Sequence, residues 1–467
     1  MGEIRRSILI ASFADNGFGI IMDVPRQFYR DFFRPHLKIV RGEGVYVFDE
    51  NGKKYLDASG GANASIPIGH GVVPVIDTMI DQARKISFVP MHLFSNEPAE
   101  RLCNEIATIT PESLTTTWLV SSGSEATENA VKIVRQYYFE RGSVGKFKII
   151  TRWQSFFGNT LGALSVGGHT FRRSKYIPLL KEMPHIPPAY CYRCWFRREY
   201  PDCDIDCATF LEKVVRQEGP ACVAGFIAEP IVGATTGATT PPKEYFQIIR
   251  EICDKYDMKF IADEVQCGMG RTGKWFAIEH WGISPDVITT AKGLAGGYTP
   301  LGAVIVRDSI IEEFIKAKSN IVGGHTSCAN PLSSAVGLAV IQYVKANNLI
   351  EKCAEIGKYL MKRLTELKEH PIVGDVRGMG LMIGIEFVKD KETKEPFPPD
   401  AKIAATVTNE ALQRGVIIYP GTGTADGILG DHILLTPPYT ITQEHADAIV
   451  SVLDESIRTV EKLHHIT

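Results

Sequence analysis

Residues 222–292 alternate between short strand-like runs and a helical run, and this alternation restricts the possible folds more than any other feature of the sequence. The runs 222–228, 258–262 and 287–290 are short and apolar or β-branched, which is typical of buried strands. Between the first two, residues 243–257 repeat apolar side chains at helical spacing: Phe246, Ile249, Ile252, Cys253 and Tyr256. Strands alternating with helices, here from about residue 100 to 310, predict an α/β fold with a parallel sheet covered by helices.

Each of these three predicted strands ends close to a polar residue, namely Glu229, Asp263 and Lys292. In open α/β sheets, ligands bind beyond the carboxyl ends of the strands, so we expect these side chains to converge on one crevice. A polar residue at a single strand end is often only a surface residue. Three of them in one unit favour a shared site.

The last third of the chain predicts a smaller α+β unit. Residues 349–369 and 444–463 each place apolar side chains on one face of a helix, and residues 380–387 alternate like a half-buried strand. The charged residues 389–395, followed by three prolines, predict a solvated loop.

The composition excludes several classes of partner. The 467 residues carry a formal net charge of −3, which attracts neither nucleic acid nor an anionic membrane, and no apolar stretch approaches the roughly 20 residues that span a bilayer. Arg5-Arg6 and the apolar residues 7–13 faintly resemble a secretion signal, but the run is near the minimum length, and a myristoylation motif at Gly2 fails because residue 6 is Arg. Ten cysteines in a chain this long suggest a reducing compartment. We expect a cytoplasmic protein whose partners are small molecules and itself.

The segment Ser121–Ala126 precedes a predicted helix over residues 127–137. A turn of small hydroxyl residues and glycine at a helix N-terminus leaves backbone N–H groups free and places the positive end of the helix dipole there, which suits a phosphate. The alternative is an ordinary capped helix with Ser as the N-cap and Glu125 in the first turn.

Further blocks follow in a fixed order: Phe156-Phe157-Gly158-Asn159-Thr160, Glu229-Pro230, Asp263-Glu264-Val265-Gln266, Ala291-Lys292-Gly293, and Thr326 with Asn330-Pro331. Together with residues 122–126, and from about residue 40 onward, they make the chain similar to the class III pyridoxal-phosphate-dependent aminotransferases. The resemblance implies a fold type I α/β protein. Its large domain, residues 71–330, would hold a mainly parallel seven-stranded sheet, and residues 1–70 and 331–467 would form a smaller α+β domain.

The resemblance implies two catalytic residues. Lys292 would hold pyridoxal 5'-phosphate as a Schiff base, which only a primary amine can form, and would shuttle the proton during turnover. Asp263 would pair with the pyridine nitrogen and keep it protonated, so that the ring accepts electrons. Without the resemblance, Lys292 could be a surface lysine and Asp263 a turn cap.

Other residues of the matched blocks would contact the cofactor. Val265 and Phe156 would pack on opposite faces of the ring, although both could equally be plain core. Gly123 and Ser124 would hold the phosphate, Gln266 would reach the ring hydroxyl, and Thr326 would contact the phosphate from the partner subunit, which implies a homodimer with active sites at the interface. The predicted cofactor site is completed by Ser122, Phe157, Gly158 and Glu229, and no metal is expected in it.

The implied function is a ping-pong transamination from a primary amine or ω-amino acid to an oxo acid such as pyruvate. An aminomutase or a decarboxylase on the same scaffold is the alternative, because a fold does not determine a reaction. A cofactor-free scaffold stabilised by metal at a cysteine cluster is a third hypothesis, against which the intact lysine and aspartate argue.

Departures from the family pattern concern the substrate pocket. Relatives that bind a substrate carboxylate often use an arginine near residues 430–438, but this chain has none between Gly415 and Pro438. Residues 62–65 supply only small side chains, and Phe157 stands where many relatives have His or Trp. The sequence therefore favours amines whose far end is not a carboxylate. The alternative is that Arg172 or Arg173 reaches the site and restores ordinary amino acid use.

Two further motifs need separate interpretation. Residues 268–273 match the glycine spacing of a dinucleotide-binding turn, but no helix is predicted to open at the last glycine, so we do not expect nicotinamide binding. Four cysteines cluster in a Pro- and Tyr-rich loop: Cys191, Cys194, Cys203 and Cys207. They could bind zinc, but we favour loop thiols because the second pair is one residue longer than a CxxC.

Overall fold

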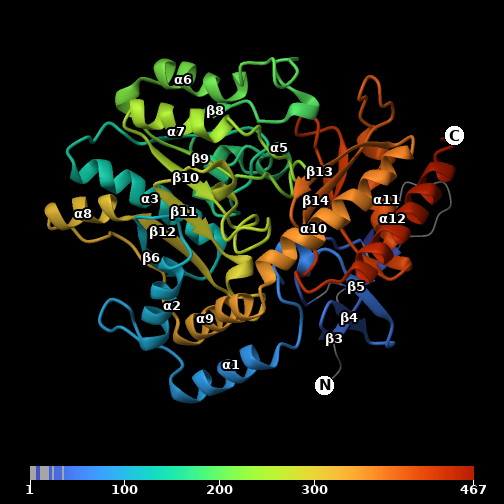
Figure 1. The fold of residues 1–467 in the computed structure, drawn as a ribbon, viewed down its shortest axis with the longest axis horizontal. Coiled ribbons are helices and arrows are strands. Elements are labelled where there is room, and N and C mark those ends of the chain that lie inside the picture. The colour runs from blue at the N-terminus through green and yellow to red at the C-terminus, as the bar shows by residue number, and fades with distance from the viewer. Residues whose placement is uncertain (1–6, 11–19, 24–25, 34–35, 467) are drawn as a thin grey trace.

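The computed structural model describes residues 7–10, 20–23, 26–33 and 36–466, and its larger part is a seven-stranded sheet with helices on both faces (Figure 1). The strand order is β6-β12-β11-β10-β9-β7-β8, and β12 runs antiparallel to its neighbours β11 and β6. The strands are β6 (Leu114–Val120), β7 (Lys148–Arg152), β8 (His185–Ile186), β9 (Val223–Ala228), β10 (Lys259–Asp263), β11 (Val287–Thr290) and β12 (Gly302–Arg307). The predicted mainly parallel α/β sheet is confirmed.

Strand β9 is buried along its whole length, because helices cover both sides of it. Successive side chains of a strand point to opposite faces, so Phe226 joins one apolar core with Phe246 of α7 (Tyr245–Lys255), while Ile227 joins a second core with Ala130 and Ile133 of α3 (Gly123–Glu140). A strand covered on both faces needs a continuous apolar run, which explains why residues 222–228 could be recognised.

The C-terminal part contains a second, antiparallel sheet with the order β13-β14-β17-β16. Its strands are β13 (Val373–Met379), β14 (Met382–Phe387), β16 (Tyr419–Thr422) and β17 (Asp431–Leu435), and the helices beside it are α10 (Leu349–Thr365), α11 (Ile403–Gln413) and α12 (Gln443–Leu463). The predicted helices at 349–369 and 444–463 are confirmed, except that residues 366–369 form a 3-10 turn.

A third sheet joins the two ends of the chain. It contains β3 (Ile39–Glu43), β4 (Tyr46–Asp49), β5 (Lys54–Asp57) and β15 (Val416–Ile417). Leu56 of β5 pairs with Val416 of β15 in parallel register, so the N-terminal segment is hydrogen-bonded to the C-terminal part. The small unit is therefore built from both ends of the chain, as the fold class predicted.

Helix α9 (Pro331–Ala346) begins where the predicted large domain ends, and it packs against α1 (Val73–Lys85) and α2 (Glu97–Ala107). The domain boundaries after residues 70 and 330 stay a prediction. The remaining α-helices are α4 (Leu161–Val166), α5 (Thr170–Arg173), α6 (Asp206–Glu218) and α8 (Asp308–Lys316).

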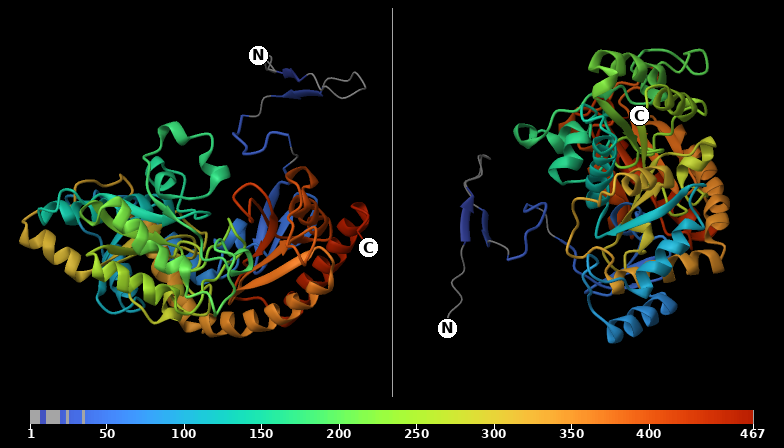
Figure 2. Two further views of the ribbon diagram at one scale, coloured as in Figure 1. Left: turned by 90° about the horizontal axis from the view of Figure 1, so that it is seen from above. Right: turned by 90° about the vertical axis from the view of Figure 1, so that its left-hand side faces the viewer.

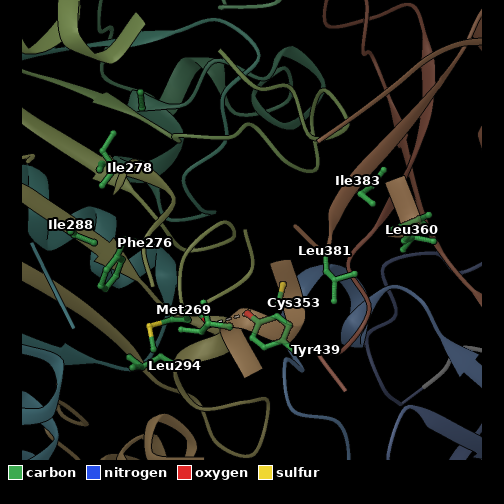
Figure 3. Close-up of a cluster of buried hydrophobic side chains, with 14 of the residues drawn as sticks. Met269, Phe276, Ile278, Ile288, Leu294, Cys353, Leu360, Leu381, Ile383 and Tyr439 are labelled. Carbon is green, nitrogen blue, oxygen red and sulfur yellow. Dashed lines mark hydrogen bonds between the residues drawn. The ribbon is translucent and has the colours of Figure 1, made fainter. Parts of the chain in front are cut away.

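The part with the seven-stranded sheet and the C-terminal part share an apolar core. Figure 3 shows Met269 and Leu294 from the sheet side next to Cys353, Leu381 and Tyr439 from the C-terminal side. The Tyr439 hydroxyl donates a hydrogen bond of 2.9 Å to the backbone carbonyl of Met269. This packing fixes the loop after β11, which carries Lys292, against the C-terminal part.

Near the N-terminus, β1 (Ser7–Ile10) pairs with β2 (Ile20–Asp23), and this pair stands away from the main body (Figure 2). The features considered at Gly2 and Arg5-Arg6 lie outside the described residues, and the apolar run at 7–13 is described only as far as Ile10. Within the described ranges, no helix combines the length and the apolar character needed to cross a membrane.

Candidate active site

The carboxyl ends of β9, β10 and β11 open onto a cavity of about 440 Å³. The cavity brings together every predicted cofactor residue except Thr326: Ser122, Gly123, Ser124, Phe156, Phe157, Gly158, Glu229, Asp263, Val265, Gln266 and Lys292. The expectation that the polar strand ends converge on one crevice is therefore confirmed.

Lys292 follows β11 after one residue and has a left-handed backbone conformation with φ of 41°. Its side chain reaches the cavity, and burial lowers its pKa from 10.5 to about 8, although Asp263 opposes this effect; the positive charge of Arg172 adds to it. A lysine with a pKa near 8 is mostly protonated at pH 7, but its neutral fraction is far larger than that of an ordinary lysine, and the neutral amine is the nucleophilic form.

Asp263 is the last residue of β10 and is 3% exposed. Its Oδ1 accepts a hydrogen bond of 3.0 Å from the backbone N–H of Val265, and its Oδ2 lies 3.4 Å from the hydroxyl of Thr127. Burial raises the pKa of this carboxyl from 3.8 to about 8, and the nearby Glu229 contributes to the increase. A carboxyl with this pKa is largely protonated at neutral pH in the empty cavity, and a cation placed beside it would favour its ionised form.

Helix α3 begins at Gly123, so the predicted start at residue 127 is wrong by four residues. Ser122 is the N-cap, and its hydroxyl accepts a hydrogen bond of 3.2 Å from the N–H of Glu125, so the interpretation as a capped helix is confirmed. Ser122, Gly123 and Ser124 also line the cavity, which places the first turn and its positive dipole end beside Lys292.

Two glycines of the site are required by close packing. A Cβ on Gly123 would lie 2.7 Å from Cγ1 of Val265, and a Cβ on Gly158, where φ is 138°, would lie 2.5 Å from Oγ of Ser124. Both glycines therefore allow the chain to approach neighbouring residues closely, and the second also adopts a backbone conformation that other residues avoid.

Glu229 anchors the loop that carries Phe156. Its Oε1 accepts a hydrogen bond of 2.9 Å from the N–H of Phe156, and its carboxylate forms an ion pair of 3.6 Å with the buried Arg152. Phe156 borders the cavity, whereas Phe157 is 3% exposed and packs mainly into the core beneath α3.

Gln266 is held by residues from two distant segments. Its side-chain amide donates to Oδ1 of Asn63, and its Oε1 accepts a hydrogen bond of 3.3 Å from the N–H of Ala234. Asn63 also lines the cavity, and sequence reasoning had noted it only as one of several small side chains.

Two residues of the cavity are relevant to carboxylate binding, because the chain has no arginine between Gly415 and Pro438. Arg172 lines the cavity, whereas Arg173 lies over the ring of Trp153 at 5.7 Å and does not line it. The structure therefore supports Arg172 in the alternative that an arginine near the Phe156 block reaches the site. Tyr419 lines the cavity as well, and sequence reasoning missed it; its position inside the segment without arginine was the available signal.

Thr326 is exposed and lies apart from this cavity within one chain. It borders a separate groove of about 1540 Å³ together with Phe88, Met91 and Phe94. Its predicted role requires a partner subunit and stays a prediction.

The structure also describes the glycine motif at residues 268–273 and the loop with four cysteines. Residues 268–273 form turns without a helix, and the next helical segment is a 3-10 turn at Ala277–Trp281, which agrees with the rejection of a dinucleotide site. The four loop cysteines border one small cavity of about 20 Å³, but in the described part of the chain no three His, Cys, Asp or Glu side chains form a group suited to a metal.

The side chains around the main cavity fit pyridoxal 5'-phosphate. A buried amine with a lowered pKa suits its aldehyde, a buried carboxyl suits its ring nitrogen, and the first turn of α3 suits its phosphate. The close approaches at Gly123 and Gly158 keep this turn free of side chains that would fill it.

Comparison with known proteins gives the family. Residues 30–457 match the family model described as Aminotransferase class-III. The chain is 40% identical to the "Uncharacterized aminotransferase YodT" of Bacillus subtilis, over 90% of this chain and 94% of that protein. It is 34% identical to the "Putrescine--pyruvate aminotransferase" of Pseudomonas aeruginosa, over 89% of each chain.

Among solved structures, an amine transaminase from an uncultivated Pseudomonas species, solved in a form with bound pyridoxal phosphate, matches with a TM-score of 0.88. It is 29% identical, and the match covers 93% of this chain and 99% of that one. On this evidence the chain belongs to the class III aminotransferases, enzymes that use pyridoxal 5'-phosphate.

Proposed function

We propose that this enzyme transfers the amino group of a primary amine or an ω-amino acid to a small oxo acid such as pyruvate, by a ping-pong mechanism. The observation that carries the proposal is the pairing of Lys292 and Asp263 in one cavity, each with a strongly shifted pKa. The cofactor supplies an aldehyde that takes up the amino group and a ring that withdraws electrons from the donor carbon.

In this proposal Lys292 performs two tasks. With the cofactor present, its amine would hold the cofactor between turnovers and would take up and return the proton of the donor carbon. A pKa near 8 suits both, because the same amine must be neutral to accept a proton and protonated to return it. The small neighbours Ala291 and Gly293 leave room for this movement.

Asp263 holds a proton on the ring nitrogen of the cofactor. The hydrogen bonds from Val265 N–H and Thr127 fix its carboxylate at the base of the cavity. Val265 and Phe156 position the ring from its two sides, and Glu229 keeps Phe156 in place through the backbone hydrogen bond. Gln266, oriented by Asn63, binds the ring hydroxyl.

Gly123 and Ser124 bind the phosphate at the start of α3, and Thr326 of a second subunit completes this site, so the working unit is a homodimer. In support, Thr326 is exposed on the rim of a groove that contains several exposed apolar side chains, among them Met91 and Phe94. Exposed apolar patches of this kind are typical of protein interfaces.

The choice of pyruvate as acceptor is supported by the Pseudomonas aeruginosa relative, which is named for putrescine and pyruvate. A cytoplasmic location remains our expectation, because ten cysteines in a chain of this length suit a reducing compartment.

The test is a panel of ω-amino acids, diamines, arylalkylamines and α-amino acids, each assayed with pyruvate and with 2-oxoglutarate. We expect one alanine formed for each donor amine lost, with a terminal amine giving the highest kcat/KM with pyruvate, and we expect Lys292→Ala to abolish turnover. Carbon dioxide release, or a product that keeps the amino group, would instead indicate a decarboxylase or an aminomutase. Glutamate as the best donor would contradict the proposed substrate class.

A further inference from the structure

Arg172 is a cationic residue of the cavity whose contacts leave it available to a ligand. Its guanidinium Cζ lies 4.2 Å from the centre of the Phe156 ring, and its Nη2 donates a hydrogen bond of 3.4 Å to the Tyr419 hydroxyl. Its Nε is buried and has no hydrogen-bond partner among the described residues. Among the residues that the structure describes, no carboxylate lies within ion-pair distance of the Arg172 guanidinium.

We infer that Arg172, oriented by Tyr419, binds the carboxylate of the oxo acid acceptor and is the main determinant of carboxylate recognition in this enzyme; this inference rests on the proposed function. Arginine presents two parallel N–H donors that match a carboxylate, and its charge strengthens both hydrogen bonds. The charge of Arg172 is also close enough to Lys292 to help lower the pKa of that amine, which places the two groups in one electrostatic environment.

The acidic residues of the cavity do not neutralise Arg172. Glu229 is paired with Arg152 and with the N–H of Phe156. Asp263 is hydrogen-bonded to Val265 and Thr127 at the end of β10. A negatively charged group supplied by a substrate is therefore the partner that Arg172 lacks.

Tyr419 explains how the enzyme manages without an arginine between residues 415 and 438. Strand β16 places Tyr419 in this segment at the cavity, where its hydroxyl accepts the hydrogen bond from Arg172 of α5. The carboxylate site is thus shared between α5 of the sheet side and β16 of the C-terminal side.

The ring of Phe156 gives Arg172 a second function. When the donor is an amine without a carboxylate, the guanidinium keeps its favourable contact with the ring and its hydrogen bond to Tyr419. When an oxo acid occupies the same cavity, Arg172 provides the charge it needs. One pocket can then accept both substrates of the ping-pong cycle.

The test compares pyruvate with propanal, an acceptor of the same length without a carboxylate, in the second half-reaction of the intact enzyme. The pyridoxamine form of each variant is mixed with each acceptor, and the ratio of kcat/KM for pyruvate to that for propanal is measured. This ratio is internal to each variant, so partial loss of folded protein cancels.

Arg172→Met should lower the ratio by roughly 10- to 100-fold, the loss expected for hydrogen bonds to a charged group, mainly through a higher KM for pyruvate. Arg172→Lys should fall between this variant and the wild type, because lysine keeps the charge without the paired donors. Tyr419→Phe should lower the ratio several-fold. The matched control is Arg173→Met, in the same helix, whose guanidinium lies over Trp153 and does not line the cavity.

An unchanged pyruvate-to-propanal ratio in Arg172→Met would overturn the inference. A fall of this ratio in Arg30→Met but not in Arg172→Met would overturn it as well, because Arg30 is the other arginine that lines this cavity in the described residues. Binding of propionate, which cannot react, gives a second readout by calorimetry and should weaken in the same order. If the proposed function itself is wrong, the wild-type enzyme will convert neither pyruvate nor propanal. This result differs from an unchanged ratio in an active Arg172→Met variant, so the two failures can be told apart.

Discussion

Replacing Lys292 with methionine should stabilise the cofactor-free protein while abolishing transamination. The wild-type lysine must be protonated in a cavity that disfavours the charge, and a pKa lowered from 10.5 to about 8 corresponds to up to about 3 kcal/mol of lost folding free energy at pH 7. Methionine has a similar length and volume, so it removes the charge without leaving a large void. The interaction with Asp263 reduces the gain, because that carboxyl loses its favourable partner.

The stability advantage of Lys292→Met over the wild type should depend on pH. Below pH 8 the lysine is protonated in both folded and unfolded states, so the full penalty is present. Between pH 8 and 10.5 the unfolded chain still binds the proton while the folded protein has released it, so wild-type stability rises with pH and the advantage of the variant disappears.

The assay is urea unfolding of the cofactor-free wild type and variant at pH 7, 9 and 10.5, at one fixed protein concentration because assembly affects the midpoint. The control is Lys243→Met, a lysine whose side chain is 83% exposed, which should change stability by less than about 0.5 kcal/mol. A variant that is less stable than wild type at pH 7, or a gain that is equal at pH 7 and 10.5, would refute the reasoning.

Further predictions concern the second catalytic residue, the assembly and the cysteine loop. Asp263→Asn should keep the cofactor bound, since the amide can occupy the same hydrogen-bond positions, but should slow the half-reaction with the amine by at least about 100-fold; a wild-type rate in stopped-flow absorbance would make Asp263 structural. Lys292→Ala and Thr326→Trp, each inactive alone, should partly restore activity when mixed and refolded, whereas an active monomer in sedimentation would contradict the role of Thr326. Metal analysis of protein purified without chelator should find no stoichiometric zinc, and one zinc per chain would show that the four cysteines of the 191–207 loop are ligands.

Strands β9, β10 and β11 were predictable because they are buried almost throughout and therefore consist of short apolar or β-branched runs. The start of α3 was not, because glycine and serine are weak helix formers, and Gly123 is needed there by its contact with Val265 from another segment. Arg172 could be named from the sequence only as one of two candidates. The choice between neighbouring arginines depends on the direction in which the short helix α5 presents them, and this is set by packing against Phe156 and Trp153.

The pairing of β5 with β15 has a consequence for how the protein is made. Leu56 is synthesised 360 residues before its partner Val416, which at about 5–20 residues per second corresponds to a delay of roughly 20 to 70 s on the ribosome. During that time β5 has a free edge on the side that β15 later occupies. Tyr419, which lines the cavity, is also synthesised after this point, so a chain truncated before residue 416 would lack both the strand that pairs with β5 and one wall residue of the cavity.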